Sequence, residues 1–457
     1  MEIANKIVYF LGIGGIGMSA LARFYQVKGF KIFGYDLTET PLTKALTNEK
    51  MILHFDASVE AIPKEIIENK NCEIIYTPAI PKDHPGFVFL SENGYNLKKR
   101  SDALGMITKE HKTLAIAGTH GKTTTTAIAA HILKNSSLAT VSFVGGIMTG
   151  YETNILIDPD PEWVLVEADE FDRSFLKLSP RYLGITSIDA DHLDIYENKE
   201  DLLHSFQELA QKVNDSKDVI VCDLVPKESI ENSIRYGFSL SSDIKLKSNG
   251  YEDGYHLVEV MGMAKDPVNF KIPMPGNHNA LNAVLAATIC YKAGCGLETI
   301  VKSISSFMGV KRRFEYIYSS PQCIFIDDYA HHPREIDALI EAVKQLYPGR
   351  KITGIFQPHL FSRTRDFADE FAESLSHLDT LYLMDIYPAR EKAIPGITSK
   401  MLLEKVQLNQ KSIVNKESLA VLISSTIPEI LLTIGAGDIA HLVPDLKQTV
   451  INSLGHL

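Results

Sequence analysis

The stretch at residues 112–130, KTLAIAGTHGKTTTTAIAA, constrains the fold of this 457-residue chain more than any other. An apolar run leads into a glycine-containing segment, and a run of helix-forming residues follows it. This order predicts a strand, a loop and a helix, in which loop N–H groups and the helix N-terminus bind phosphate. The loop consists of Gly118, Thr119, His120, Gly121, Lys122, Thr123 and Thr124.

The loop differs in one position from the common phosphate-binding pattern. That pattern has a glycine five residues before Gly121, where this chain has Ile116. The remaining residues keep their expected chemistry, because Lys122 supplies a charge for the terminal phosphates and Thr123 a hydroxyl for Mg²⁺. We therefore interpret the segment as a compact variant of the phosphate loop.

Composition sets broad limits on the fold and on the partners. The chain is 45% apolar and 23% charged, with a net charge of −11, which is typical of a globular protein of about three domains. Scattered basic residues argue against a nucleic-acid partner. Five cysteines without a CxxC pair indicate neither a disulfide framework nor a zinc site. Without a signal peptide or a long apolar run, we expect no membrane insertion and a cytoplasmic location.

A second glycine turn lies near the N-terminus. Apolar residues 6–12 predict a strand, residues 18–29 a helix, and residues 31–35 a second strand that ends before an acid. This is the layout of a dinucleotide-binding fold, although the same turn accepts any nucleotide diphosphate. A further strand at 73–77 ends in a loop at the edge where ligands bind. The candidate binding residues are Gly12, Gly14, Gly15, Gly17, Asp36, Thr77 and Ala79.

Two acidic clusters follow predicted strands downstream of the phosphate loop. Glu167 ends the apolar run that begins at Trp163. In proteins with a phosphate loop, an acid at the end of a neighbouring strand holds Mg²⁺. The second cluster, residues 189–194, contains His192 and three aspartates. Such a cluster alone is commonly a solvated loop, but two of them after strands of one domain favour a site for Mg²⁺ or Mn²⁺. We take Thr123, Glu167 and His192 as candidate ligands.

The remainder of the chain adds an insertion and another alternating region. Residues 235–275 predict antiparallel strands, and a helix follows that carries Asn279 and Asn282 on one face. Arg312 and Arg313 can clamp phosphate or belong to a solvated linker. After residue 320 strands and helices alternate, which predicts a further α/β domain. Its strands are followed by polar residues, among them Asp328, His332, His359 and Arg363.

These motifs together resemble the Mur ligase family. The resemblance covers essentially the whole chain and includes GIGGIGMSALA, AGTHGKTTTT, EADEFD, ADHLDIY, PGNHNALNA, RRF, DDYAHHP and FQPHLFSRTRD. It implies three domains: a Rossmann-like domain for the UDP substrate at 1–105, a P-loop ATPase domain with an antiparallel strand insertion at 106–312, and a Rossmann-like α/β domain for the amino acid at 313–457. The chain departs from the usual family pattern at Phe55-Asp56, at Thr186-Ser187 and at Leu360.

The resemblance also implies an activity and a set of roles. It is closest to members that join L-alanine to UDP-N-acetylmuramate with ATP and Mg²⁺ or Mn²⁺, through an acyl phosphate and a domain closure. It implies that Lys122, Glu167, His192, His332 and Arg363 are catalytic and that His332, His359 and Arg363 contact alanine and the acyl phosphate. The ATP contacts that it implies outside the loop are His278, Asn279, Asn282, Arg312 and Asp328.

Three alternative functions stay open at this point. The nearest is a murein-peptide recycling ligase, which joins a whole peptide with the same chemistry. A Rossmann dehydrogenase and a nucleotide-gated binding protein are the others. The amino acid preferred among alanine, serine and glycine, the metal, and the choice between monomer and dimer do not follow from the sequence.

Overall fold

The chain folds into two compact units. The computed structural model describes residues 6–189, 196, 198–389 and 391–455. One unit comprises residues 1–247, 259–270 and 281–307, and the other comprises residues 248–258, 271–280 and 308–457. The domain limits at 105 and 312 stay a prediction. Within the described part of the chain, none of the helices has the length and apolar content needed to cross a membrane.

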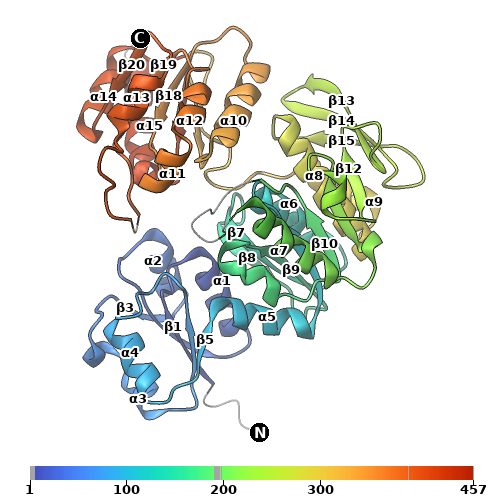
Figure 1. Cartoon of the computed structure of the whole chain (residues 1–457), viewed down its shortest axis with the longest axis vertical. Helices are drawn as coiled ribbons and strands as arrows, with labels where there is room; N and C mark the ends of the chain where they lie inside the picture. The colour runs from blue at the N-terminus through green and yellow to red at the C-terminus, as the bar shows by residue number, and fades with distance from the viewer. Residues whose placement is uncertain (1–5, 190–195, 197, 390, 456–457) are drawn as a thin grey trace. The chain divides into compact units, whose positions relative to one another are not determined.

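The N-terminal sheet is the parallel sheet that the first glycine turn predicted (Figure 1). Its strand order is β3-β2-β1-β4-β5, so the chain adds strands on one side of β1 and then on the other. The point between β1 and β4 is a topological switch point, where ligands bind in such sheets. Its elements are β1 (Ile7–Leu11), α1 (Ile16–Val27), β2 (Lys31–Tyr35), α2 (Pro41–Asn48), β3 (Ile52–His54), α3 (Lys64–Glu68), β4 (Glu73–Tyr76), α4 (Pro85–Glu92), β5 (Leu97–Lys99) and α5 (Arg100–Glu110).

The second sheet has ten strands in the order β15-β14-β13-β12-β11-β10-β6-β9-β7-β8. The strand before the phosphate loop, β6, is an interior strand and pairs in parallel with β10 and β9. Its elements are β6 (Lys112–Ala117), α6 (Lys122–Lys134), β7 (Thr140–Met148), β8 (Thr153–Ile157), β9 (Trp163–Ala168), β10 (Tyr182–Ile185), α7 (Lys199–Gln211), β11 (Val219–Cys222), β12 (Ile234–Gly237), β13 (Ile244–Glu252), β14 (Tyr255–Met261), β15 (Val268–Ile272), α8 (Asn277–Ala293) and α9 (Leu297–Ser305).

The strands at residues 235–275 lie where the alternating pattern predicted them, with one difference in direction. Asp253 and Gly254 have positive φ values of 51° and 82°, as a tight hairpin turn between β13 and β14 requires. The first strand of the set, β12, instead pairs in parallel with both β11 and β13. The alternation of side chains does not distinguish these directions, because it reports only which face of a strand is buried.

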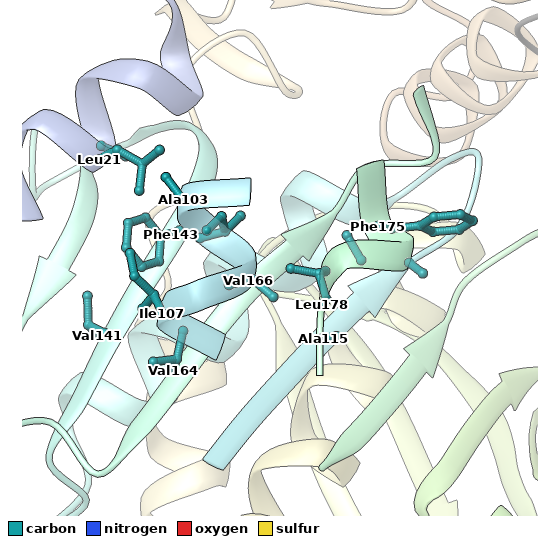
Figure 2. Close-up of a cluster of buried hydrophobic side chains, with 14 of the residues drawn as sticks. Leu21, Ala103, Ile107, Ala115, Val141, Phe143, Val164, Val166, Phe175 and Leu178 are labelled. Atoms are coloured by element: carbon teal, nitrogen blue, oxygen red, sulfur yellow. The ribbon is translucent and has the colours of Figure 1, made fainter. Parts of the chain in front are cut away.

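The two sheets of the first unit share one apolar core. It includes Phe10 of β1 and Val166 of β9, both fully buried. Figure 2 shows Leu21 of α1 and Ala103 of α5 beside Phe143 of β7, which is 6% exposed. The helix that follows the first glycine turn therefore packs on the sheet that carries the phosphate loop.

A buried polar network joins the same elements. Arg23 of α1 donates to both carboxylate oxygens of Glu49, at 2.8 and 2.7 Å, and to Asn154 of β8 at 2.5 Å. Asn154 is fully buried, and its amide donates to Ile16 O at the start of α1 and to Ser19 Oγ. Because unpaired buried polar groups are costly, this network fixes the start of α1 against β8.

The C-terminal sheet has the order β16-β17-β21-β18-β19-β20. All neighbours are parallel except the edge strand β16, which pairs antiparallel with β17. The elements are β16 (Glu315–Ser319), β17 (Ile324–Asp328), α10 (Pro333–Leu346), β18 (Ile352–Phe356), α11 (Phe361–Asp366), α12 (Ala368–Leu375), β19 (Thr380–Leu383), α13 (Ser399–Lys405), β20 (Gln410–Ile413), α14 (Lys416–Ser425), β21 (Ile430–Ile434) and α15 (Val443–Gly455). The alternation predicted after residue 320 is confirmed, whereas β16, β20 and α14 were not predicted.

Candidate active site

The phosphate loop depends on two glycines with positive φ. Gly118 has φ = 133°, and a Cβ at this position would lie 2.0 Å from Thr186 Oγ1. Gly121 has φ = 81° and directly precedes α6, and a Cβ there would lie 2.4 Å from Asn282 Oδ1. Both positions therefore combine a left-handed backbone with a close neighbour, and only glycine meets both conditions.

The loop is hydrogen-bonded to the segment that leaves β10. The Thr119 N–H donates to Ser187 O at 3.1 Å, and the His120 N–H donates to Ser187 Oγ at 3.0 Å. In return, the Asp189 N–H donates to Thr119 Oγ1 at 3.1 Å. The strand that precedes the second predicted acidic cluster thus supports the loop, and it brings the first residue of that cluster beside it.

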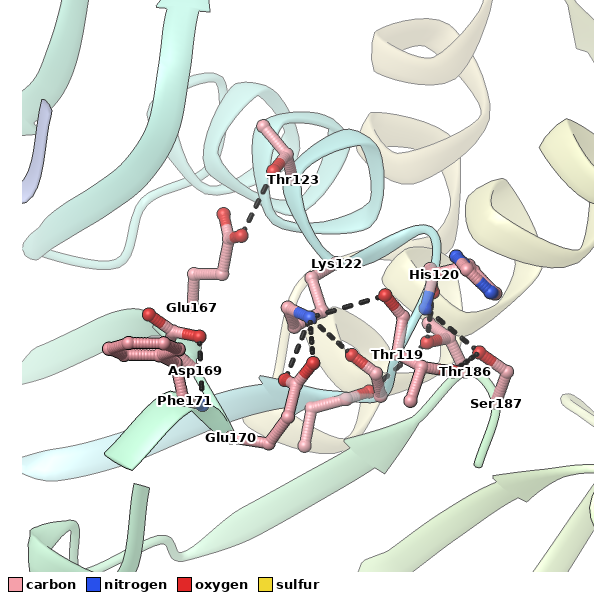
Figure 3. A network of polar contacts seen from close by, with 12 residues as sticks. Thr119, His120, Lys122, Thr123, Glu167, Asp169, Glu170, Phe171, Thr186 and Ser187 are labelled. Atoms are coloured by element: carbon pink, nitrogen blue, oxygen red, sulfur yellow. Dashed lines mark hydrogen bonds and ion pairs between the residues drawn. The ribbon is translucent and has the colours of Figure 1, made fainter. Parts of the chain in front are cut away.

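Lys122 has an anionic partner, Glu170, that the motif did not predict (Figure 3). Its ammonium lies 2.9 and 2.8 Å from the two Glu170 carboxylate oxygens and 2.5 Å from Gly118 O. Burial alone would lower the pKa of Lys122, but Glu170, Asp169 and Glu167 together raise it above its usual value. Lys122 is therefore a charged ammonium at the centre of the loop.

Thr123 and Glu167 place two oxygen donors together at the start of α6. The Thr123 hydroxyl donates to Glu167 Oε1 at 2.9 Å, and the second carboxylate oxygen accepts from the Gly145 N–H at 3.0 Å. A Cβ at residue 145 would lie 2.2 Å from Glu167 Oε2. Glycine at this position on β7 is therefore what allows the carboxylate to lie where it does.

The first glycine turn lies beside the loop that follows β4. A Cβ at Gly12, where φ is 85°, would lie 2.4 Å from Thr77 Cγ2. The Gly14 N–H donates to Asp36 Oδ2 at 2.7 Å, so this carboxylate orders the turn itself. The Ala79 N–H donates to Thr77 Oγ1 at 3.4 Å.

A pocket of about 290 Å³ extends from the first glycine turn to Glu167, the carboxylate that the Thr123 hydroxyl of the phosphate loop contacts. Gly15 and Gly17 line one part of it, and Glu167 and Asp169 line another. Arg100 also lines the pocket, and its guanidinium lies 3.6 Å from an Asp169 oxygen. A ligand bound to the first turn therefore has a continuous path to the carboxylates beside the phosphate loop.

The predicted pair on α8 is buried rather than solvated. Asn279 is 5% exposed, and its amide donates to Pro275 O at 2.7 Å. Asn282 is 6% exposed and accepts from Thr125 Oγ1 at 3.2 Å. His278, which directly precedes Asn279, is exposed. The structure thus places Asn282 against α6, next to Gly121 of the loop.

Arg312 and Asp328 lie within the second unit. The Arg312 guanidinium donates to Asp327 Oδ2 at 3.1 Å and to Gly435 O at 2.5 Å. It is therefore held in place, unlike an arginine in a solvated linker. Asp328 accepts from the N–H groups of Phe314 and Ala330, at 2.7 and 2.8 Å.

The three candidates for amino-acid contacts also lie in the second unit. His332 caps α10, where its Nδ1 accepts from the Arg334 N–H at 3.4 Å, and it is 5% exposed. The His359 ring stacks on Tyr387 with 5.7 Å between ring centres. Arg363 is a buried residue of α11, whose N-cap Leu360 has a positive φ of 70°. The segments that follow β17 and β18, including the start of α10 and the helix α11, thus carry these polar residues.

Comparison with protein families accounts for all of these sites together. Three domain families match the chain: "Mur ligase family, catalytic domain" over residues 7–112, "Mur ligase middle domain" over residues 116–290, and "Mur ligase, glutamate ligase domain" over residues 312–439. The chain belongs to the Mur ligase family. The three-domain Mur ligase fold predicted from the sequence is therefore confirmed.

Individual relatives of this Mur ligase match over nearly their full length. The UDP-N-acetylmuramate–L-alanine ligase of Christiangramia forsetii is 44% identical, covering 98% of each chain. That of Cytophaga hutchinsonii is 45% identical, covering 96% of each chain. The crystal structure of the Thermotoga maritima UDP-N-acetylmuramate-alanine ligase has a TM-score of 0.82 and 26% identity, covering 98% of this chain and 99% of that one. The Psychrobacter arcticus murein peptide ligase shares the fold with a TM-score of 0.69 at 19% identity, covering 99% of each chain.

Two side chains of this Mur ligase offer oxygen donors to a divalent cation. A hydroxyl and a carboxylate, on Thr123 and Glu167, are the hard oxygen ligands that Mg²⁺ prefers. His192, the third predicted ligand, lies outside the described residues. Among the described residues there is no group of three or more His, Cys, Asp or Glu side chains that could hold a metal. The two described residues therefore fit part of an Mg²⁺ site.

Several residues of the site were not predicted. Glu170, Ser187 and Gly145 support the loop or its carboxylate, and Arg100 lines the pocket. The EADEFD motif contained Glu170, but nothing in its spacing indicates which acid faces the lysine. The sequence around Gly145 does not indicate its role, because glycine is needed there only to make room for Glu167, 22 residues away in sequence.

We predict that Gly145→Ala destabilises the chain by about 1–3 kcal/mol, because the new Cβ displaces the Glu167 carboxylate. Gly296→Ala is the matched control, since its nearest atom, Thr299 Oγ1, would lie 4.0 Å away. Urea unfolding measures both. Combining Gly145→Ala with Glu167→Ala should recover most of the loss; an undiminished loss in the double variant would place the clash elsewhere.

We also predict a pH-dependent contribution from Asp328. Burial raises the pKa of Asp328 to about 6, although Arg313 and two backbone N–H groups act in the opposite direction. The unfolded carboxyl titrates near pH 4, so between about pH 4 and 6 only the folded form keeps the proton. The stability contribution therefore falls as pH rises through this window. Urea midpoints of wild type and Asp328→Asn should diverge across it, and parallel curves would contradict the assignment.

Proposed function

We propose that this Mur ligase joins L-alanine to the lactyl carboxylate of UDP-N-acetylmuramate and converts ATP to ADP and phosphate. The reaction proceeds through an acyl phosphate, because a carboxylate has no leaving group until it is phosphorylated. The product is a peptidoglycan precursor, and we place its synthesis in the cytoplasm. The substrates are small molecules, and the proposal requires neither nucleic acid nor a membrane.

The pocket that runs from the first glycine turn to Glu167 and Asp169 is the observation that carries this proposal. One side is lined by the turn proposed to hold the UDP diphosphate, through Gly15, Gly17 and Thr77. The other side is lined by Glu167 and Asp169, beside the phosphate loop. A substrate with a diphosphate at one end and a carboxylate at the other can therefore reach both. Neither a dehydrogenase nor a nucleotide-gated binding protein requires this connection.

The comparisons support alanine over a whole peptide as the second substrate. Relatives that are 39–45% identical over nearly the full length are named UDP-N-acetylmuramate–L-alanine ligases. The murein peptide ligase shares the fold at a lower TM-score. A Thermotoga maritima MurF ligase with a TM-score of 0.61 was solved in complex with ADP, which supports a nucleotide in the same fold.

The residues of the first unit suggest how phosphoryl transfer is assisted. The Lys122 ammonium and the loop N–H groups at the start of α6 stabilise the charge on the transferred phosphoryl group, whereas those of Thr119 and His120 bind Ser187. Thr123, Glu167 and His192 would hold Mg²⁺, which when bound neutralises phosphate charge and polarises the phosphoryl oxygens. Arg100 would orient the carboxylate end of the UDP substrate within the pocket.

The remaining assignments are proposals that rest on the family resemblance. The nucleotide contacts proposed in this way are His278, Asn279, Asn282, Arg312 and Asp328. His332, His359 and Arg363 contact alanine and the acyl phosphate. An arginine suits both anions, because its planar guanidinium forms two parallel hydrogen bonds.

Phosphate release tests the function directly. The purified chain is given Mg²⁺ and ATP, with UDP-N-acetylmuramate and each of alanine, serine, glycine and the murein tripeptide. We expect release that requires both the UDP substrate and alanine. Faster turnover with the tripeptide would indicate a recycling ligase, and release without an amino acid would remove the ligase proposal.

We predict that Lys122→Ala lowers the rate of alanine-dependent phosphate release by about 100- to 1000-fold, the effect of losing one transition-state contact of about 3–4 kcal/mol. Binding of UDP-N-acetylmuramate, measured by calorimetry, should be unchanged, because the diphosphate turn is separate. Lys134→Ala, at the other end of α6, is the control. Loss of UDP-substrate binding with normal turnover at saturation would contradict the assigned role.

A further inference from the structure

The ion pair between Lys122 and Glu170 is fully buried at the carboxylate and mostly buried at the ammonium. Glu170 is 1% exposed and the Lys122 side chain is 12% exposed. Both carboxylate oxygens contact the ammonium. Buried ion pairs add little net stability compared with apolar replacements, because desolvation of the charges offsets their attraction. Stability alone therefore does not explain why this pair is present.

The location of Lys122 makes an anion necessary. Lys122 is the first residue of α6, where the helix dipole disfavours a positive charge and favours a negative one. The first turn of α6 contains no acidic residue. The ammonium also accepts no hydrogen bonds, and its other contacts are carbonyl oxygens of Gly118 and Thr119. Glu170 supplies the compensating charge from a different element.

The backbone holds Glu170 in this position. Its carbonyl accepts from Tyr196 Oη at 2.6 Å and from the Arg173 N–H at 3.0 Å. The next turn contains two residues with left-handed backbone, Asp172 at φ = 54° and Arg173 at φ = 53°. Such non-glycine conformations cost on the order of 1–3 kcal/mol each. The chain thus tolerates strain in the turn that brings the Glu170 carboxylate under the loop.

We propose that Glu170 is a positioning residue that holds the Lys122 ammonium in the loop and competes with nucleotide phosphate for it. This inference rests on the proposed function, since it assigns to the same loop a control of nucleotide affinity. A phosphate that binds Lys122 displaces a carboxylate rather than water. Glu170 therefore weakens the binding of ATP and ADP and speeds the departure of ADP after each turnover.

Glu170→Gln tests the proposal, because the amide keeps the size and one acceptor but removes the charge. Binding of Mg·ADP is measured by isothermal titration, together with kcat and KM for ATP. We expect the Kd for Mg·ADP to fall by about tenfold, as removal of a competing charge at this distance allows. The KM for ATP should fall with it, and kcat should fall because ADP leaves more slowly.

Two further variants keep the test decisive. Glu162→Gln removes an exposed carboxylate that pairs with Lys112 at the start of β6, and it should leave the Kd for Mg·ADP within about twofold. Glu170→Asp keeps the charge but withdraws it, so its Kd should lie between wild type and Glu170→Gln. If Glu170→Gln does not fold, a Kd for Glu170→Asp below that of wild type still supports the proposal.

The outcomes separate this inference from the proposed function. Weaker binding of Mg·ADP to Glu170→Gln or to Glu170→Asp would overturn the competition and give Glu170 a supporting role only. An unchanged Kd would also overturn it. A wild-type chain that binds no Mg·ADP would instead overturn the proposed function, whatever the variants do.

Discussion

The hydrogen bonds between the phosphate loop and the segment after β10 are the interaction on which the rest of the site depends. A loop with two left-handed glycines has little intrinsic preference for one conformation, so its shape must be imposed by neighbours. Ser187 binds the loop backbone with its carbonyl and its hydroxyl, and Thr119 binds the Asp189 N–H in return. Because β6 and β10 are adjacent in the sheet, strand register alone brings these residues together.

The elements that could be predicted are those whose signal is local. The strands β1, β2, β4 and β6 and the helix after each glycine turn follow from apolar runs bounded by glycine. The edge strands β16 and β20 did not follow, because partly exposed strands carry no continuous apolar run. A different reason applies to β12, whose parallel pairing is set by its neighbours and not by its own residues.

The residues of the site could likewise be predicted only where the signal is local in sequence. Lys122, Thr123 and Glu167 lie together, as the motif spacing implied, whereas Glu170 and Gly145 became apparent only from side-chain positions. Asn279 and Asn282 illustrate a further limit. Their spacing placed them on one helix face. Whether that face is buried depends on the elements that pack against it, and these do not follow from the spacing.

Two glycines that line the pocket, Gly17 and Gly145, have ordinary backbone conformations and are required only for space. A Cβ at Gly17 would lie 2.8 Å from Arg100 Nη1, just as one at Gly145 would meet Glu167. During evolution, a larger residue at 17 can be accommodated by a shorter side chain at 100. No equivalent second-site change is open at 145, since shortening Glu167 withdraws its carboxylate. Space alone therefore permits a paired change on the substrate side of the pocket, whereas it permits none on the side next to the phosphate loop.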